Sequence, residues 1–253
     1  ITESIKDTST MDRFGIHKFQ MEDFGSEELN VFKKSYRHLS AFNEHYEKFC
    51  FERWFVTETI RKRSPERIYV LLDSDVAVFS RASDLVPSLP DCAISLCENS
   101  PHFTFVKGSV GGFLNFILDN YSDPTKISHL ENLRQESQNK GQNYNLSDQA
   151  FLALYMKESI EMQNYKKNTT NGCIDTNIHI PDGFEFNQLR RRPRKKIFWQ
   201  MESDRVIPYF TNGDRLTRAL LLHFQGPGKR VFYRFNGGKF FGSKLGLFVL
   251  NQV

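Results

Sequence analysis

Apolar side chains between residues 27 and 61 recur at steps of three and four, as at Leu29, Phe32 and Tyr36. This spacing predicts an amphipathic helix, because residues at those steps lie on one helical face. Ser26, which is followed by two glutamates, is typical of a helix start. We therefore expect one long helix over 27–61.

Further stretches predict helices and loops downstream. Residues 111–121 and 147–155 have helical apolar spacing, whereas 124–145 is mostly polar and predicts an exposed helix and loop. Residues 161–172 are polar and rich in asparagine, which predicts a mobile loop. No element is predicted for the Phe- and Gly-rich tail over 231–253.

A continuous run of strand-forming apolar residues over 68–72 predicts a strand buried on both faces, as in parallel sheets. Shorter apolar runs predict further strands at 76–79, 92–97, 197–199 and 220–222. Strands that alternate with helices favour an α/β fold, with a mostly parallel central sheet flanked by helices. A length of 253 residues suits one domain over 1–253.

The composition is that of a globular protein, with 39% hydrophobic and 25% charged residues. No apolar run approaches the roughly 20 residues that span a bilayer, so we expect no transmembrane segment in this chain. The chain begins at Ile1 without methionine, and an anchor ahead of it stays open. The four cysteines show no CxxC spacing and are interpreted as ordinary thiols. The net charge of +4 suits an anionic ligand.

Asp73-Ser74-Asp75 directly follows the predicted strand over 68–72. In open α/β sheets, ligands bind beyond the carboxyl ends of the strands. Two carboxylates this close together are stabilised by a cation, and a hard divalent ion with oxygen ligands is their natural partner. A solvated turn is the alternative, but the apolar residues on both sides of the triplet favour a metal site.

A second polar segment follows the predicted strand 220–222 and runs from His223 to Lys229 as His-Phe-Gln-Gly-Pro-Gly-Lys. A neutral imidazole suits manganese-like ions. Gly226 and Gly228 allow the backbone to approach a ligand closely, and the ammonium of Lys229 would bind a phosphate. The alternative is a structural histidine followed by a simple turn.

Two predicted helix starts carry candidate ligand-binding residues. Gly111-Gly112 lacks side chains that would keep a flat or bulky group away, although a tight turn into a helix explains the pair equally well. Asp148-Gln149 follows Ser147, which is a candidate N-cap. An acid beside the helix dipole explains Asp148 but leaves Gln149 unexplained.

In their order along the chain, these motifs resemble glycosyltransferase family eight, the glycogenin-like retaining enzymes, and their relatives of GT-A fold. That family has a D-x-D after an apolar strand, a glycine-containing helix start, an Asp-Gln pair and an H-F-x-G-x-x-K motif, whose fixed positions are all present here. Arg53 is similar to the family's arginine that reaches the donor sugar. The resemblance covers about residues 50–230. The family's Pro-Trp after the lysine is absent, and its first strand and nucleotide-binding turn are not recognisable in 1–26.

The resemblance implies a single GT-A-like, Rossmann-like domain, with 1–26 truncated or divergent and 231–253 a C-terminal extension. It implies a transferase that moves a sugar from a nucleotide-diphosphate sugar to a hydroxyl acceptor, with retention of configuration. A UDP-sugar is the expected donor, and a glycan, glycoprotein or glycolipid is the expected acceptor. Mn²⁺, or Mg²⁺ in its place, would be held by Asp73, Asp75 and His223.

The other motif residues acquire roles through the same resemblance. The donor would be bound by Arg53, Asp73, Ser74, Gly111, Gly112, Gly226, Gly228 and Lys229. Asp148 and Gln149 are the implied catalytic residues and would face the anomeric carbon, while Asp148 and Arg53 would also fix sugar hydroxyls. The compartment stays open between the cytoplasm and, where an anchor precedes the chain, the Golgi lumen.

The densest cluster of charge is the basic run over 190–196. A solvated loop is its first interpretation, and an anionic acceptor or a lipid surface is the alternative. Nucleic acid is not expected as a partner, because neither a recognised module nor interleaved aromatic residues accompany the run.

Two other functions stay open. The strand and D-x-D also resemble the opening of Mg²⁺-dependent haloacid-dehalogenase-like phosphohydrolases, whose first aspartate is a nucleophile. That motif normally begins its domain, and the segment from His223 to Lys229 would have no role in such an enzyme. The second alternative is a non-catalytic module that binds nucleotide sugars, against which the intact metal trio argues.

Overall fold

The computed structural model describes most of the chain, namely residues 21–64, 66–141, 146–187, 194–202 and 205–226. The mixture of helices and strands confirms the predicted α/β class. The chain divides into two compact units, which we call the helical unit and the sheet unit. The helical unit comprises the described parts of Phe19–Leu71 and Pro90–Asn164, and the sheet unit comprises Leu72–Leu89 and the described part of Tyr165–Val253. A single domain of GT-A fold stays a prediction.

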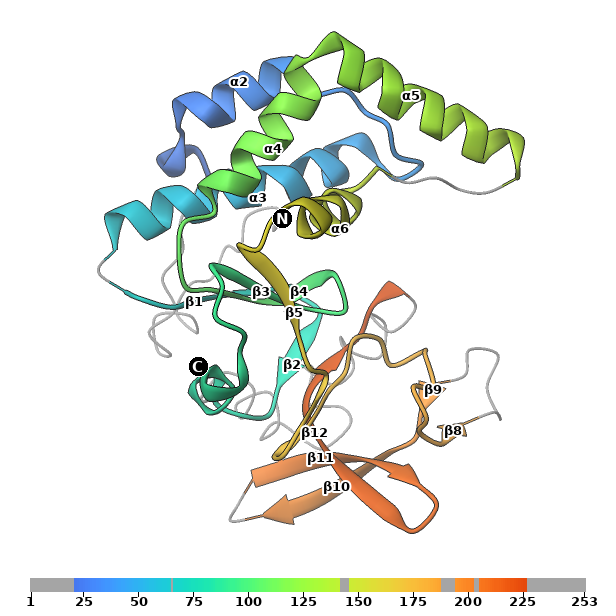
Figure 1. Ribbon diagram of the computed structural model, residues 1–253. Coiled ribbons are helices and arrows are strands. Elements are labelled where there is room, and N and C mark those ends of the chain that lie inside the picture. The colour runs from blue at the N-terminus through green and yellow to red at the C-terminus, as the bar shows by residue number, and fades with distance from the viewer. Residues whose placement is uncertain (1–20, 65, 142–145, 188–193, 203–204, 227–253) are drawn as a thin grey trace, which may run out of the picture. The chain divides into compact units, whose positions relative to one another are not determined.

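The helical unit contains five long helices, labelled in Figure 1, which are α2 (Glu27–Ser35), α3 (Glu44–Arg63), α4 (Gly111–Ser122), α5 (Pro124–Asn139) and α6 (Asp148–Glu158). A short 3₁₀ helix, η1 (Met21–Phe24), precedes them. A four-stranded sheet accompanies the helices in the order β1-β4-β3-β5, with bounds β1 (Tyr69–Leu72), β3 (Ile94–Cys97), β4 (Ser100–Val106) and β5 (Met162–Tyr165).

The single helix predicted over 27–61 is wrong, because the segment forms two helices. Tyr36 leaves the helical conformation with ψ of 130°, and the side chain of Asn43 then caps the start of α3 by accepting a backbone N–H of its first turn. Ser26 caps α2 as expected. The apolar spacing continues across the break, since both helices face the same core.

Aromatic rings fill the core of the helical unit. Tyr121 and Phe151 stack with their ring centres 5.3 Å apart and their planes 4° from parallel. Phe51 meets both rings edge-on at 88°, and Phe32 joins the same cluster. Such pairs add to the free energy of burial through their ring quadrupoles. The abundance of phenylalanine in the sequence is therefore accounted for in part by packing.

The strand predicted over 68–72 exists as β1, but it is not buried on both faces. Tyr69 and Leu71 pack against the core of the helical unit, whereas Val70 and Leu72 are 38% and 44% exposed. The pattern is that of a strand with one buried face, which a continuous apolar sequence does not predict.

The sheet unit is built on strands that form a six-stranded sheet, whose strands are labelled in Figure 1. Its path is β10-β11-β12-β7-β6, and β2 also pairs with β12. The bounds are β2 (Val76–Val78), β6 (Asn168–Thr169), β7 (Gly172–Ile174), β10 (Ile197–Glu202), β11 (Arg205–Asn212) and β12 (Arg215–His223). The unit also contains β8 (Phe186–Asn187), β9 (Arg194–Lys195) and the 3₁₀ helices η2 (Ala82–Asp84) and η3 (Val86–Ser88).

The described sheets are mixed, which corrects the prediction of a mostly parallel sheet. Strand β12 runs parallel to β7 but antiparallel to β11 and β2. Only Gly213-Asp214 connects β11 to β12, and so short a connection joins antiparallel strands. The mobile loop predicted over 161–172 is also wrong, because this segment contributes β5 and β6.

Two expectations about the chain as a whole can be compared with the described residues. No helix among them combines the length and the apolar character needed to cross a bilayer. The four cysteines are free thiols, as interpreted from their spacing. The predicted extension over 231–253 and the segment 1–20 lie outside the described residues.

Candidate metal centre

The pairing of β2 with β12 places His223 beside the turn that carries Asp73 and Asp75. In this antiparallel pair His223 lies opposite Val76, and the N–H of Phe224 donates to the carbonyl oxygen of Asp75 at 3.0 Å. A shift of one residue in this register would turn the imidazole to the other face of the sheet. The strand register therefore brings together residues that are far apart in the sequence.

Asp73, Asp75 and His223 each offer one ligand atom, and these atoms lie within 4.8 Å of one another. Asp75 and His223 are buried, and Asp73 is half-buried. Ligand oxygens lie about 2.0–2.6 Å from a hard divalent ion, so ligands on opposite sides are roughly 4–5 Å apart. Two carboxylates and an imidazole suit a manganese-like ion. The three residues predicted as ligands thus lie together within the sheet unit, and a cation bound to them stays a prediction.

The imidazole of His223 is fixed by contacts at both nitrogens. Its Nδ1 lies 2.6 Å from the carbonyl oxygen of Thr176, and its Nε2 lies 3.5 Å from Oδ1 of Asp75. A carbonyl oxygen can only accept, so Nδ1 carries a proton and Nε2 faces the carboxylates. A hydrogen bond of this kind commonly selects the tautomer of a metal-binding histidine.

Opposing influences act on the pKa of His223. Burial lowers the pKa of the imidazole, but the carboxylate of Asp75, the carbonyl of Thr176 and the charge of Asp73 outweigh burial and raise it above its usual value. Without a cation, the ring therefore holds its second proton more tightly than an ordinary histidine does. A divalent cation would compete with that proton for Nε2.

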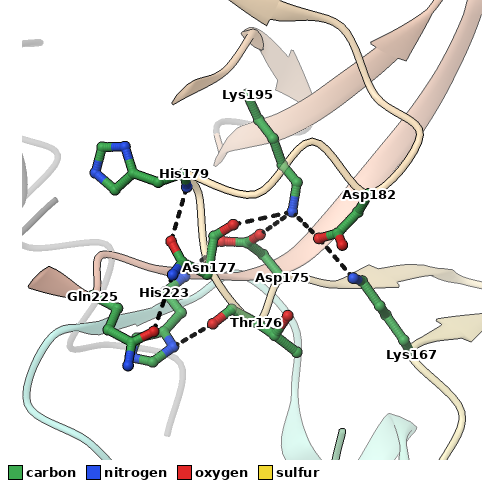
Figure 2. Close-up of polar contacts among 9 residues, drawn as sticks. All are labelled: Lys167, Asp175, Thr176, Asn177, His179, Asp182, Lys195, His223 and Gln225. Carbon is green, nitrogen blue, oxygen red and sulfur yellow. Dashed lines mark hydrogen bonds and ion pairs between the residues drawn. The ribbon is translucent and has the colours of Figure 1, made fainter. Parts of the chain in front are cut away.

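An ion-pair network centred on the buried side chain of Lys195 lies next to His223, and Figure 2 shows its members. The ammonium of Lys195 lies 2.6 Å from Oδ1 of Asp175 and 2.5 Å from Oδ2 of Asp182, and it also donates to the carbonyl of Asn177. Lys167 is the second cation on Asp182, at 2.6 Å. Burial raises the pKa of Asp175, while the ammonium of Lys195 acts in the opposite direction.

Sequence reasoning missed this network. The run over 190–196 predicts a solvated loop first, yet the side chain of Lys195 is 0% exposed, and residues 188–193 lie outside the described residues. One signal was available, because Asp175 directly follows an apolar strand end just as Asp73 does. The contact to His223 depends on strand pairing, which no local pattern reveals.

In the helical unit, the structure brings together Arg53 and Asp148. Nη2 of Arg53 donates to Oδ2 of Asp148 at 2.5 Å, and Nε1 of Trp54 donates to the same oxygen at 3.3 Å. Ser147 caps α6, as its alternative interpretation proposed. Asp148 is buried and fully engaged at Oδ2, whereas Gln149 beside it is exposed.

Gly111 and Gly112 form the first turn of α4. A side chain at Gly112 would collide with the hydroxyl of Tyr155 and the carboxylate of Glu161, which are hydrogen-bonded to each other at 2.6 Å. The space beside Gly112 is therefore filled by the side chains of Tyr155 and Glu161. A role for the two glycines in binding a donor stays a prediction.

The remaining candidate residues belong to the sheet unit. Ser74 is exposed on the D-x-D turn. Gly226 has φ of +57°, a left-handed conformation that favours glycine, and no atom of the described residues lies within 4 Å of where its Cβ would be. Gly228 and Lys229 lie outside the described residues, so their phosphate-binding role stays a prediction.

Comparison with protein-family models, with curated proteins and with solved structures finds no match for this chain.

Proposed function

We propose that this protein is a metal-dependent glycosyltransferase that uses a nucleotide-diphosphate sugar, with a UDP-sugar as the expected donor and a glycan, glycoprotein or glycolipid hydroxyl as the acceptor. One observation carries the proposal. Asp73, Asp75 and His223 present their ligand atoms within 4.8 Å of one another. These are the residues for which the resemblance to family eight implies a shared Mn²⁺ or Mg²⁺.

In the proposed reaction the sheet unit supplies the cation site. Asp73 and Asp75 offer oxygen ligands, and His223 offers Nε2 because Nδ1 is bound to Thr176. A divalent cation held there would act as a Lewis acid for the departing nucleoside diphosphate. Ser74, the glycines at 226 and 228, and Lys229 are proposed to bind the phosphates of the donor.

The resemblance to family eight also supports a role for Arg53 and Asp148 in binding the donor sugar. Arg53 and Asp148 together present a guanidinium and a carboxylate, which match the donor and acceptor character of sugar hydroxyls. Asp148 or its neighbour Gln149 is proposed to face the anomeric carbon. Gly111 and Gly112 are proposed to border the same ligand. Retention of configuration follows from the resemblance alone and would be decided by the anomeric form of the product.

The first experiment is a thermal-shift screen of UDP- and GDP-sugars with and without Mn²⁺. A ligand that binds only the native state at 100 times its Kd stabilises the protein by about 2.7 kcal/mol. We expect a UDP-sugar to raise the melting temperature only when Mn²⁺ is present. Asp75→Asn should abolish this shift, whereas Asp84→Asn, at an exposed aspartate of the same unit, should leave it unchanged.

Turnover assays separate the proposal from its alternatives. A glycosyltransferase should hydrolyse its nucleotide sugar slowly with Mn²⁺ and no acceptor. Release of phosphate from an aryl phosphate with Mg²⁺ would support a phosphohydrolase with Asp73 as nucleophile instead. Binding of UDP without sugar turnover would support a non-catalytic module.

A further inference from the structure

The buried position of Lys195 calls for an explanation beyond folding. The side chains of Lys195 and Asp175 are both 0% exposed, and the ammonium also lies 5.3 Å from the ring centre of Phe210. Removing two charges from water is costly, and buried ion pairs are often no more stable than apolar residues of similar volume. A buried pair is therefore weak support for stability alone.

The segment from Asp175 to Ile178 holds His223 at three points. Oδ2 of Asp175 accepts the backbone N–H of His223 at 3.0 Å, and the carbonyl of Thr176 accepts from Nδ1 at 2.6 Å. The N–H of Ile178 donates to the carbonyl of His223 at 3.2 Å. The backbone and the ring of this candidate metal ligand are thus both positioned by one short segment.

Lys195 in turn holds that segment at three points. Its ammonium binds Oδ1 of Asp175 and the carbonyl of Asn177, and its backbone N–H donates to the carbonyl of Ile178 at 2.8 Å. Because Lys195 binds Oδ1 of Asp175, the other carboxylate oxygen is left directed at His223, as Figure 2 shows. A chain of contacts therefore connects a buried ammonium to the metal ligand.

We propose that Asp175 is a positioning residue for His223, and that Lys195 fixes Asp175 and its segment so that Nε2 is held where a divalent cation binds. This inference rests on the metal centre of the proposed function and adds a determinant of its metal affinity. Hydrogen-bonded partners of metal ligands typically change metal affinity by about 10- to 100-fold when they are replaced.

The test compares two double variants that both lack the buried charges. Asp175→Leu with Lys195→Met removes the acceptor for the N–H of His223, whereas Asp175→Asn with Lys195→Met retains an amide oxygen at that position. We expect the first to bind Mn²⁺ at least about tenfold more weakly than the second, measured from the free Mn²⁺ signal in electron paramagnetic resonance. The visible spectrum of bound Co²⁺ should also change in the first variant.

Asp182→Asn serves as the matched control. It removes the other carboxylate from Lys195 without touching His223, and asparagine tolerates the positive φ of +51° at this position. We expect it to lower the unfolding midpoint in EDTA and to leave Mn²⁺ affinity within about threefold of the unmodified protein. Where a double variant does not fold, the single variants Asp175→Leu and Asp175→Asn, which both keep Lys195 and its contact with Asp182, repeat the same comparison.

Equal Mn²⁺ affinity of the paired variants would overturn the inference and leave the proposed function standing. Mn²⁺ binding by the unmodified protein without turnover of any nucleotide sugar would end the proposed function and leave the inference intact. Absence of Mn²⁺ binding by the unmodified protein would end both.

Discussion

His223 and Thr176 are joined by a hydrogen bond of 2.6 Å between Nδ1 of the ring and the backbone carbonyl oxygen. This contact fixes which nitrogen carries the proton in the neutral ring, because a carbonyl cannot donate. The other ring nitrogen, Nε2, then carries no proton in the neutral ring, and its lone pair faces Asp73 and Asp75. The candidate metal centre is therefore defined by a backbone contact as much as by its acidic side chains.

The affinity for Mn²⁺ should depend on pH through His223. The pKa of the imidazole is raised above its usual value in the absence of a cation, and a cation must displace the proton from Nε2. We expect affinity to be fully developed above that raised pKa and to fall about tenfold per pH unit below it. Titrations from about pH 5.5 to 8.5, with Mn²⁺ followed by electron paramagnetic resonance, would measure this slope.

His223→Gln provides the control for that titration. Its amide does not titrate over this range, so the remaining affinity should be weaker and should lose the slope that His223 contributes. An affinity of the unmodified protein that stays constant from pH 8 to pH 5.5 would contradict a role for His223 as a metal ligand.

The candidate site was predictable where local sequence carries the chemistry. Two of its features are local patterns, namely the acidic pair after an apolar strand and the histidine at the end of another strand. Both strands, β1 and β12, are present in the structure. The pairing of Asp175 with Lys195 was not predictable, because it depends on the approach of β7, β9 and β12 in space. A run of basic residues is ordinarily exposed, so its sequence gave no sign that Lys195 is buried.

The fold was predictable to a similar extent. Amphipathic spacing identified α4 and α6, and short apolar runs identified the strands on either side of the acidic pair. The same spacing did not predict the break between Tyr36 and Asn43. The helices on both sides of the break pack into the same core, so apolar residues recur at similar steps across it. Strand direction was not encoded locally either, since it follows from the length of each connection and from pairing between distant segments.

Asp148→Asn should separate sugar chemistry from metal binding. The change removes the carboxylate that accepts from Arg53 and Trp54 in a buried site. We expect a loss of about 2–3 kcal/mol in the free energy of unfolding, because the half-buried guanidinium of Arg53 loses its charged acceptor. Turnover of a nucleotide sugar should be lost while Mn²⁺ affinity is retained, since the metal ligands belong to the sheet unit.

The control for this variant is Asp119→Asn at an exposed position of α4. It should change stability by less than about 0.5 kcal/mol and leave turnover intact. Urea unfolding and a coupled assay for released UDP are the measurements. Full turnover by Asp148→Asn would remove Asp148 from the proposed sugar site.

Gly112→Ala should destabilise the helical unit. The added methyl would displace the hydrogen-bonded hydroxyl of Tyr155 and carboxylate of Glu161, and such overpacking costs about 1–3 kcal/mol. Gly111→Ala is the matched control, because its methyl would meet only the hydroxyl of Ser109, at 3.0 Å. Thermal unfolding of both variants gives the comparison, and an equal melting temperature would show that the space at Gly112 is not limiting.

Glu47→Gln should stabilise the protein at alkaline pH. Burial of Glu47, followed by the charge of Asp148, raises the pKa of its carboxyl from 4.5 to about 7. Because the folded state binds this proton more tightly than the unfolded state, the contribution of Glu47 to stability falls as pH rises from about 4.5 through about 7. The total loss is about 3 kcal/mol, and a neutral amide at this position does not incur it.

The gain from Glu47→Gln in urea unfolding should therefore grow from pH 5 to pH 8, while Glu44→Gln, at an exposed position of the same helix, should show no such growth. A gain that is the same at both pH values would show that Glu47 does not retain its proton in the folded protein.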